Sequence, residues 1–276
     1  MTGTVGELRR FHRQKALDEG LNPRDVDLLL ADELGRSVTY LVAHGEESLA
    51  ADSVERFESS LARRRAGEPI QYIRGKTEFY SREFFVDPRV LIPRPETELV
   101  VEALLEVASR HALVLDVGTG SGCIAVSVQL ERRDLVVIGS DRDLEALAVA
   151  SRNVHALDSR VHLVAMDLLD SVGAEFDLIV SNPPYIPTAD LEGLEVQVRA
   201  YEPRAALTSG PTGLETIERL LGEAARRVKC GGRLVMEIGW GQSEAVVRRA
   251  GAAGWKVERI IDDFAAIPRV VVLGRD

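Results

Sequence analysis

The sequence has few cysteines and no long apolar segment. Its 276 residues include only Cys123 and Cys230, which lie far apart and lack the close spacing of metal ligands. No apolar run approaches the roughly 20 residues of a membrane-spanning helix, and the amino-terminal residues lack the apolar region of a secretion signal. We therefore expect a cytoplasmic protein with no membrane segment and no bound metal.

Basic residues are outnumbered by acidic ones. The chain has 34 Lys and Arg against 44 Asp and Glu, which gives a net charge of −10. A nucleic-acid-binding domain usually carries a basic face or stripe, so this balance argues against a broad nucleic-acid footprint and leaves room only for a local basic patch. The hydrophobic and charged fractions, 45% and 28%, are ordinary for a globular protein. The length suits one large domain or two smaller ones.

The amino-terminal quarter has a helical pattern without strand signals. Leucines recur among acidic residues and arginines, and Asn22-Pro23 is typical of a helix start, with Asn22 as the cap. We predict a small helical bundle in residues 1–72. The run Arg63-Arg64-Arg65 is interpreted either as a solvated helix face or as a surface that binds a partner.

Residues 73–95 have a different character. Short apolar runs separated by polar pairs predict a β-hairpin that links two domains. A helix is expected to begin in the segment 93–98 and to end near Arg110. Glu96 and Glu98 in its first turn either stabilise the helix dipole or face a ligand cleft.

Strand and helix patterns alternate regularly in residues 96–276. This alternation predicts an α/β domain with a mostly parallel sheet and helices on both faces. The segment between Tyr185 and Gly213 shows little periodicity, and we expect a functional loop there. The predicted strands are 113–115, 135–139, 161–164, 176–180 and 233–238, followed by an antiparallel pair, 255–261 and 270–273. The predicted helices are 123–130, 144–157, 214–228 and 243–250.

A glycine-rich loop with the sequence Asp-Val-Gly-Thr-Gly-Ser-Gly, residues 116–122, follows the first of these strands. Glycines let the backbone turn tightly and come close to a ligand. The spacing Gly-x-Gly-x-Gly differs from the Gly-x-Gly-x-x-Gly of dinucleotide-binding folds. Asp141 ends the next strand, where a carboxylate can accept both hydroxyls of a ribose; a helix cap is the alternative interpretation.

The ligand suggested by these residues is a nucleoside without a pyrophosphate. Asp167 follows the third strand, where an acid can meet an adenine amino group. S-adenosyl-L-methionine fits this pattern, because its ribose suits Asp141 and its amino-acid end suits the glycine loop. The predicted cofactor-binding residues are Gly118, Thr119, Gly120, Ser121, Gly122, Asp141, Asp167, Leu168 and Asn182.

The segment Asn182-Pro183-Pro184-Tyr185 follows a strand that reads as buried. The two prolines end the strand and hold a loop at its carboxyl end, where open α/β sheets bind ligands. The Asn182 side-chain carbonyl and the Pro183 backbone carbonyl can together accept both hydrogens of an NH₂ group. Tyr185 adds an aromatic face. Taken alone, the same four residues also fit an ordinary turn capped by asparagine.

Together these motifs resemble the class I amino-methyltransferases, in which an (Asn/Asp/Ser)-Pro-Pro-aromatic loop holds a planar nitrogen against the methyl donor. Further motifs lie at residues 67–73, 90–98, 202–207 and 237–239. They resemble those of the glutamine methyltransferases of peptide release factors, the HemK-like family, and the resemblance runs from about Gly67 to the carboxyl end. Two residues depart from the family pattern: Ser81 stands where glycine is usual, and Leu168 where tryptophan is common.

The resemblance implies a Rossmann-like, seven-stranded methyltransferase domain preceded by the helical bundle and a hairpin linker. It also implies methyl transfer from S-adenosyl-L-methionine to the glutamine side chain in the Gly-Gly-Gln loop of release factors. Asn182, Pro183 and Tyr185 are then the catalytic residues, and Pro184 joins them in binding the substrate. Because every cofactor signal lies after Pro93, the bundle is expected to recognise the release factor.

Two other functions fit parts of the pattern. A nucleic-acid adenine methyltransferase uses the same kind of loop, but the acidic composition and the lack of a target-recognition domain argue against it. A non-catalytic regulator that binds S-adenosylmethionine would not need the intact Asn182 loop. We expect no direct nucleic-acid partner.

Overall fold

The computed structural model describes residues 3–170 and 173–276 and divides into two compact units, Met1–Gly75 and Lys76–Asp276. The domain boundaries predicted above differ slightly from these units and stay predictions. Among the described residues, no helix combines the length and apolar character that crossing a bilayer requires.

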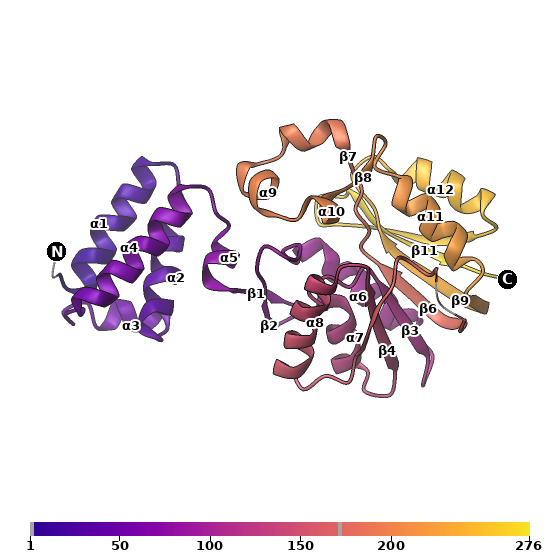
Figure 1. Cartoon of the computed structure of the whole chain (residues 1–276), viewed down its shortest axis with the longest axis horizontal. Coiled ribbons are helices and arrows are strands. Elements are labelled where there is room, and N and C mark those ends of the chain that lie inside the picture. Colours follow the sequence, from indigo (N-terminus) through magenta and orange to yellow (C-terminus); the bar gives the residue numbers. More distant parts are fainter. Residues whose placement is uncertain (1–2, 171–172) are drawn as a thin grey trace. The chain divides into compact units, whose positions relative to one another are not determined.

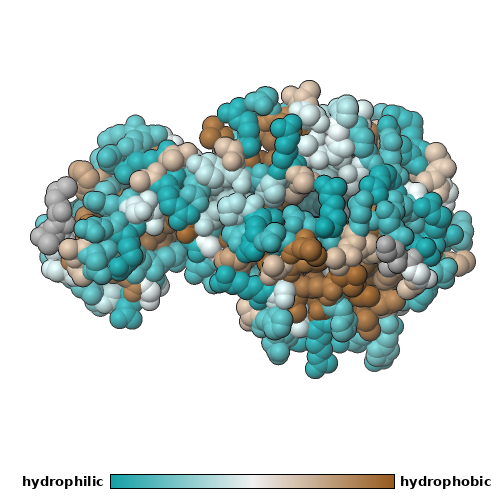
Figure 2. Space-filling model, in the orientation of Figure 1, coloured by the Kyte–Doolittle hydropathy of each residue, from teal (hydrophilic) through white to brown (hydrophobic). Residues whose placement is uncertain are grey.

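The first unit is a bundle of helices (Figure 1). Asn22 caps the second helix as predicted, because its side chain accepts a hydrogen bond from the backbone N–H of Arg24. Amphipathic faces of the helices bury a core that includes Leu30, Leu41 and Phe57, while much of the surface in view is hydrophilic (Figure 2). The helices are α1 (Val5–Asp18), α2 (Pro23–Leu34), α3 (Val38–Ala43), α4 (Ala51–Arg65) and α5 (Ile70–Arg74).

The arginine run at the end of α4 is held by carboxylates of its own unit. Arg64 pairs with the buried Asp25 at 2.7 Å, and Arg65 pairs with Glu19 at 2.7 Å. Arg63 pairs with Glu68. The run is thus engaged in ion pairs within its own unit, a role that neither of the two interpretations included.

The second unit begins with a hairpin of β1 (Lys76–Phe79) and β2 (Arg82–Phe85). Its turn residues Tyr80 and Ser81 both have positive φ, 49° and 59°, as the mirror-image turns of tight hairpins require. Ser81 thus occupies a left-handed position that suits glycine, which explains why glycine is usual there. Phe79 and Phe84 are fully buried in the core of the second unit, so the hairpin packs on that unit.

A seven-stranded sheet in the order β10-β11-β9-β6-β3-β4-β5 organises the second unit. The pairs β3/β4, β4/β5, β3/β6 and β6/β9 are parallel, whereas β11 runs antiparallel to β9 and β10, as predicted for the last strand pair. The predicted fold class is confirmed. The strands are β3 (Leu113–Val117), β4 (Val136–Asp141), β5 (His162–Ala165), β6 (Phe176–Ser181), β9 (Val228–Glu237), β10 (Lys256–Asp262) and β11 (Pro268–Gly274).

Helices cover both faces of this sheet (Figure 1). Successive residues of a strand point to opposite faces, so Val114 packs in the core beneath one helix layer and Leu115 in the core beneath the other. One layer contains α6 (Glu98–Val107), α7 (Cys123–Glu131) and α8 (Leu144–Ala156); the other contains α11 (Glu215–Ala224) and α12 (Ser243–Ala252).

Three predicted elements differ from the structure. The helix expected to run to Arg110 ends at Val107 and begins with a short 3-10 turn, η1 (Pro95–Thr97). The helix predicted for 214–228 ends at Ala224, because Val228 already pairs with Phe176 as the start of β9. The expected loop after Tyr185 holds short elements, namely β7 (Ile186–Pro187), η2 (Thr188–Gly193), α9 (Val196–Tyr201), α10 (Arg204–Leu207) and β8 (Thr208–Gly210).

The order of the strands creates a switch point between β3 and β6. From β3 the chain moves outward through β4 to β5, and then returns to β6 on the other side of β3. The connections that leave the carboxyl ends of β3 and β6 therefore diverge and open a crevice. Ligands of open α/β sheets bind in such crevices.

Candidate active site

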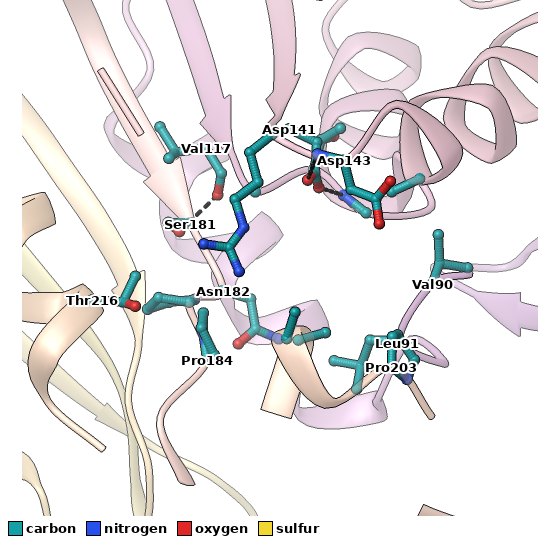
Figure 3. Close-up of a pocket in the computed structure, with 18 of the residues that line it drawn as sticks. Val90, Leu91, Val117, Asp141, Asp143, Ser181, Asn182, Pro184, Pro203 and Thr216 are labelled. Atoms are coloured by element: carbon teal, nitrogen blue, oxygen red, sulfur yellow. Dashed lines mark hydrogen bonds between the residues drawn. The ribbon is translucent and has the colours of Figure 1, made fainter. Parts of the chain in front are cut away.

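A cavity of about 360 Å³ lies at the carboxyl ends of β3, β4, β5 and β6. In Figure 3, Asp141 and Asp143 lie on one side of it, Asn182 and Pro184 on another, and Val90, Leu91 and Pro203 on a third. The size falls in the range of small-molecule sites. The predicted site residues that line it are Gly118, Thr119, Gly120, Ser121, Asp141, Asp167, Leu168, Asn182, Pro183 and Pro184; Gly122 and Tyr185 do not.

The glycine loop is shaped by left-handed backbone conformations. Gly118 and Gly120 have φ of 72° and 55°, which residues with a side chain rarely adopt. The backbone N–H of Gly120 donates to Asp141 Oδ2 at 3.0 Å, which joins the loop to the end of β4. Gly122 points away from the cavity, and an added Cβ would lie 3.3 Å from the Ala150 Cβ of α8. Gly122 therefore allows α7 and α8 to pack closely.

The Asp141 carboxylate already accepts hydrogen bonds from two backbone N–H groups. Its Oδ1 accepts from the Asp143 N–H and its Oδ2 from the Gly120 N–H, both at 3.0 Å. The helix cap that we considered as its alternative role belongs to Asp143, whose side chain accepts from the N–H of Glu145. Each Asp141 oxygen retains lone-pair capacity for a hydroxyl donor, since a carboxylate can accept about four hydrogen bonds. The carboxylate is thus fixed in orientation beside the cavity.

Asp116 at the end of β3 is completely buried and does not line the cavity. Its Oδ2 accepts from the Thr119 hydroxyl at 2.6 Å and from the Ala125 N–H at 3.2 Å. Burial raises the pKa of Asp116 to about 7. Its bonds to the glycine loop and to α7 indicate that it holds the shape of the loop.

Asp167 and Leu168 border the cavity at the end of β5. Asp167 forms an ion pair with Arg219 of α11 at 3.2 Å, so its carboxylate already has a charged partner. Leu168 has a positive φ of 49° and presents an apolar side chain to the cavity. No aromatic ring is available at position 168 for stacking.

The loop after β6 is fixed at both ends. Strand β6 ends at Ser181, directly before the two prolines, and the Ser181 hydroxyl donates to the Val117 carbonyl at 2.7 Å. Beyond the prolines, the Gln242 side chain donates to the Tyr185 carbonyl at 2.9 Å. An added Cβ at Gly213 would lie only 2.2 Å from that carbonyl oxygen, so the loop leaves no room for a side chain there.

The amide of Asn182 has one defined partner. Its Nδ2 donates to the Thr97 hydroxyl oxygen at 3.1 Å. Among residues 3–170 and 173–276, none donates a hydrogen bond to Asn182 Oδ1 or to the Pro183 carbonyl. Both residues line the cavity, so two acceptor oxygens remain available to a ligand with an NH₂ group.

Tyr185 turns toward the end of β9 and away from the cavity. Its hydroxyl donates to Glu237 Oε1 at 3.2 Å, and burial raises its pKa above the usual value. Gly239 makes room for the ring, since an added Cβ there would lie 2.9 Å from Tyr185 Cδ2. The stacking of Tyr185 on a substrate amide stays a prediction.

Thr97 and Glu237 were not predicted as site residues. The Thr97 hydroxyl donates to Glu237 Oε2 at 2.6 Å, and both side chains are buried. Of the two neighbouring acids considered above, Glu96 is exposed, and Glu98 accepts from the Tyr80 N–H at 2.8 Å. The sequence indicates Thr97 only by a hydroxyl between two glutamates, and nothing in the neighbouring residues distinguishes such a hydroxyl from a helix cap.

A buried carboxylate joins two walls of the cavity. Glu202 accepts from the Ile92 N–H at 3.2 Å and forms an ion pair with Arg94, while burial raises its pKa. The segments on either side contribute Leu91 and Pro203 to the cavity. Glu202 thus ties together two stretches that are more than 100 residues apart in sequence.

The fold and the site define a class I methyltransferase that uses S-adenosylmethionine. A family model, "Methyltransferase small domain", matches residues 95–199, and a second, "PrmC N-terminal domain", matches residues 11–75. A solved methyltransferase from Pyrococcus furiosus is similar in fold, with a TM-score of 0.55 and 19% identity over 82% of this chain and 99% of that one.

Closer similarity is found among curated proteins. Release factor glutamine methyltransferases from Koribacter versatilis and Escherichia coli are 41% and 37% identical to this chain, each over 91% of this chain and 91% of the relative. The chain belongs to the release factor glutamine methyltransferase family, as the sequence motifs predicted.

Proposed function

We propose that this protein methylates the side-chain amide nitrogen of the glutamine in the Gly-Gly-Gln loop of peptide chain release factors, using S-adenosylmethionine. The family membership supports this substrate over a nucleic-acid adenine and over a purely regulatory role. The observation in the structure that carries the proposal is the Asn182 amide, which is held through its nitrogen by Thr97 and lines the cavity beside the Pro183 carbonyl. Because release factors act in translation, we also propose a cytoplasmic place of action.

The cofactor fits the donors and acceptors of the cavity. Gly118 and Gly120 leave backbone exposed beside a space free of side chains, and the Asp141 carboxylate is oriented beside them. In the proposal, this carboxylate binds the ribose hydroxyls, the glycine loop binds the amino-acid end, and Leu168 contacts the adenine. Asp167 is also assigned to the adenine, although its ion pair with Arg219 must leave an oxygen available.

S-adenosylmethionine supplies an electrophilic methyl group on a positively charged sulfur. The amide nitrogen is a weak nucleophile, because its lone pair is delocalised into its carbonyl. The task of the protein is therefore to position this nitrogen for attack. In the proposal, Asn182 Oδ1 and the Pro183 carbonyl accept the two amide hydrogens and aim the nitrogen at the methyl carbon. Correct orientation of two reactants is worth about 7–11 kcal/mol.

The same two oxygens also stabilise the charge that develops during the reaction. As the N–C bond forms and the S–C bond breaks, positive charge develops on the nitrogen, and two fixed carbonyl dipoles stabilise it. The methylated nitrogen then loses one proton to water, which leaves a neutral secondary amide. Pro184 completes the wall of the substrate site in this scheme, and Tyr185 stacks on the substrate amide only if its ring turns from Glu237 toward the cavity.

The amino-terminal bundle is assigned to recognition of the release factor. All residues proposed for the cofactor lie in the second compact unit, and the bundle has a core of its own. This division supports separate roles for the two units.

The direct test uses labelled S-adenosylmethionine with three acceptors: a purified release factor, the same factor with the loop glutamine changed to alanine, and duplex DNA. One methyl group on the glutamine of the first factor, and none on the other two, is the expected result. Label on DNA, or equal label on the glutamine-deficient factor, would contradict the proposal.

A further inference from the structure

Thr97, Tyr185 and Glu237 form a buried hydrogen-bond network behind the Asn182 loop. The Thr97 hydroxyl is 2.6 Å from Glu237 Oε2, and the Tyr185 hydroxyl is 3.2 Å from Glu237 Oε1. Thr97 and Glu237 are 2% and 1% exposed. Since Asn182 Nδ2 is 3.1 Å from the Thr97 oxygen, the network reaches the amide that lines the cavity.

The ionised carboxylate of Glu237, at the end of the network, decides the direction of each hydrogen bond in it. An ionised carboxylate only accepts, so both hydroxyls must donate to Glu237. The Thr97 proton is then engaged, and its oxygen can only accept from Asn182. The amide carries an NH₂ group on one side and an oxygen on the other, and its hydrogen-bond partners decide which of the two points toward Thr97 and which toward the cavity. The network therefore turns the Asn182 nitrogen toward Thr97 and leaves Oδ1 for the cavity.

We propose that Glu237 is a positioning residue for the methyl transfer, acting through Thr97 to fix the orientation of the Asn182 amide and through Tyr185 to fix the rest of the loop. This role rests on the proposed function, because only an acceptor with two N–H hydrogens needs Oδ1 in the cavity.

A role in packing alone does not explain this carboxylate. Among the described residues, Glu237 has no ion-pair partner within 4 Å, and its two partners are neutral hydroxyls. A buried carboxylate without a contacting cation is costly, and an apolar residue of similar size usually gives a more stable protein. Its negative charge also polarises the network toward Asn182, which strengthens Oδ1 as an acceptor.

Protonation of Glu237 would reverse the direction of the network. A protonated carboxyl can donate to Thr97, and the Thr97 proton is then free to turn toward Asn182. The amide would accept it by rotating, and its NH₂ would face the NH₂ of the substrate. The groups around Glu237 are the hydroxyls of Thr97 and Tyr185, the cation Arg269 and the anion Glu96; burial raises its pKa to about 7. Turnover should therefore fall as the pH decreases below about 7.

The closing experiment measures kcat on a glutamine-containing release factor at saturating S-adenosylmethionine, from pH 5.5 to 9, for the wild-type protein and four variants. Thr97→Val keeps the shape of the side chain but removes the hydroxyl, and should lower kcat about tenfold or more while the Kd of the cofactor stays within about twofold. Thr97→Ser restores the hydroxyl and should restore most of the rate. Thermal unfolding of each variant checks its fold.

Glu237→Gln and Tyr185→Phe test the carboxylate itself. Glu237→Gln has no proton to gain, so the loss of rate toward low pH should disappear. Tyr185→Phe removes one donor to the charged carboxylate, which should move that loss to higher pH by about one to two units.

The outcomes separate the two proposals. A wild-type protein that never methylates the release factor refutes the proposed function and, with it, this role. Wild-type turnover together with full activity of Thr97→Val, or with an unchanged acid limb in Glu237→Gln, refutes the positioning role alone.

Discussion

Replacement of Asn182 is the sharpest test of the chemistry, because the structure assigns different tasks to the two ends of its amide. Nδ2 donates to Thr97 at 3.1 Å, and Oδ1 has no partner among the described residues. Asn182→Ala removes both. Loss of the Thr97 hydrogen bond should reduce the free energy of unfolding by about 0.5–1.5 kcal/mol, which the protein can tolerate.

Loss of Oδ1 affects the rate far more than the fold. One hydrogen of the substrate amide is left without an acceptor, and one of two dipoles that stabilise positive charge is gone. Removal of a comparable preorganised group lowers kcat by about 10²–10³, or about 2.7–4 kcal/mol. The Kd for S-adenosylmethionine, measured by calorimetry, should change little if the glycine loop and Asp141 carry cofactor binding.

Asn182→Asp separates geometry from charge. At high pH the new carboxylate cannot donate to Thr97, and it competes with Glu237 for the single Thr97 proton. When the new carboxyl is protonated, it can donate to Thr97 again and present its other oxygen to the cavity. The variant should thus gain activity as the pH falls, opposite to the wild-type protein.

The assay for both variants is single-turnover methylation of a release factor at saturating cofactor, across pH 5.5–9. An alanine variant that keeps most of the wild-type rate would refute the role of the loop. An aspartate variant whose pH profile matches the wild type would refute the orientation of the amide through Thr97.

Three further predictions concern the cofactor, the bundle and stability. Asp141→Ala should weaken S-adenosylmethionine binding by about 1.5–3 kcal/mol in calorimetry, because two hydroxyls lose a charged acceptor; unchanged affinity in a folded variant would remove Asp141 from the site. A truncated chain that begins at Lys76 should still bind the cofactor but methylate a whole release factor poorly, and full efficiency would give the bundle another role. Glu237 has a folded pKa of about 7, above its ordinary 4.5, so its contribution to stability is present below pH 4.5 and is lost as the pH rises through 7. Between pH 4.5 and 7, the free energy of unfolding of Glu237→Gln in denaturant titrations should therefore rise relative to that of the wild type, by at most about 1.4 kcal/mol per pH unit. A constant difference between the two proteins would contradict the raised pKa.

Those parts of the site that depend on local sequence were predictable. The two prolines end β6 through their own backbone chemistry, whatever the position of that strand in the sheet. The glycine loop and Asp141 are each placed by the strand that ends beside them. The sequence motifs were therefore sufficient to place the loop of Asn182 and the glycine loop at one edge of the sheet, where the structure has both lining one cavity.

Contacts between distant segments were not predictable in the same way. Thr97 and Glu237 are 140 residues apart, and no periodicity links a hydroxyl in a helix start to an acid at the end of β9. The end of α11 was misplaced for a similar reason, since pairing of Val228 with Phe176 overrides the helical pattern that continues to that point. Tyr185 has the aromatic character that was predicted, but Gly239 and Glu237 decide where its ring points.

The two halves of the site differ in how much of the chain must be synthesised before each can exist. The glycine loop and Asp141 lie within one strand-helix-strand stretch, and the bond between them spans 21 residues. The Asn182 loop is fixed by bonds that span 85 residues to Thr97 and 52 residues from Tyr185 to Glu237, on a strand whose neighbour β11 is the last in the chain. Contacts of long sequence separation form late, and a ribosome delivers the chain from its amino end. The bond between the glycine loop and Asp141 thus depends only on a stretch that is synthesised early, whereas the orientation of the acceptor amide depends on strands that are synthesised last.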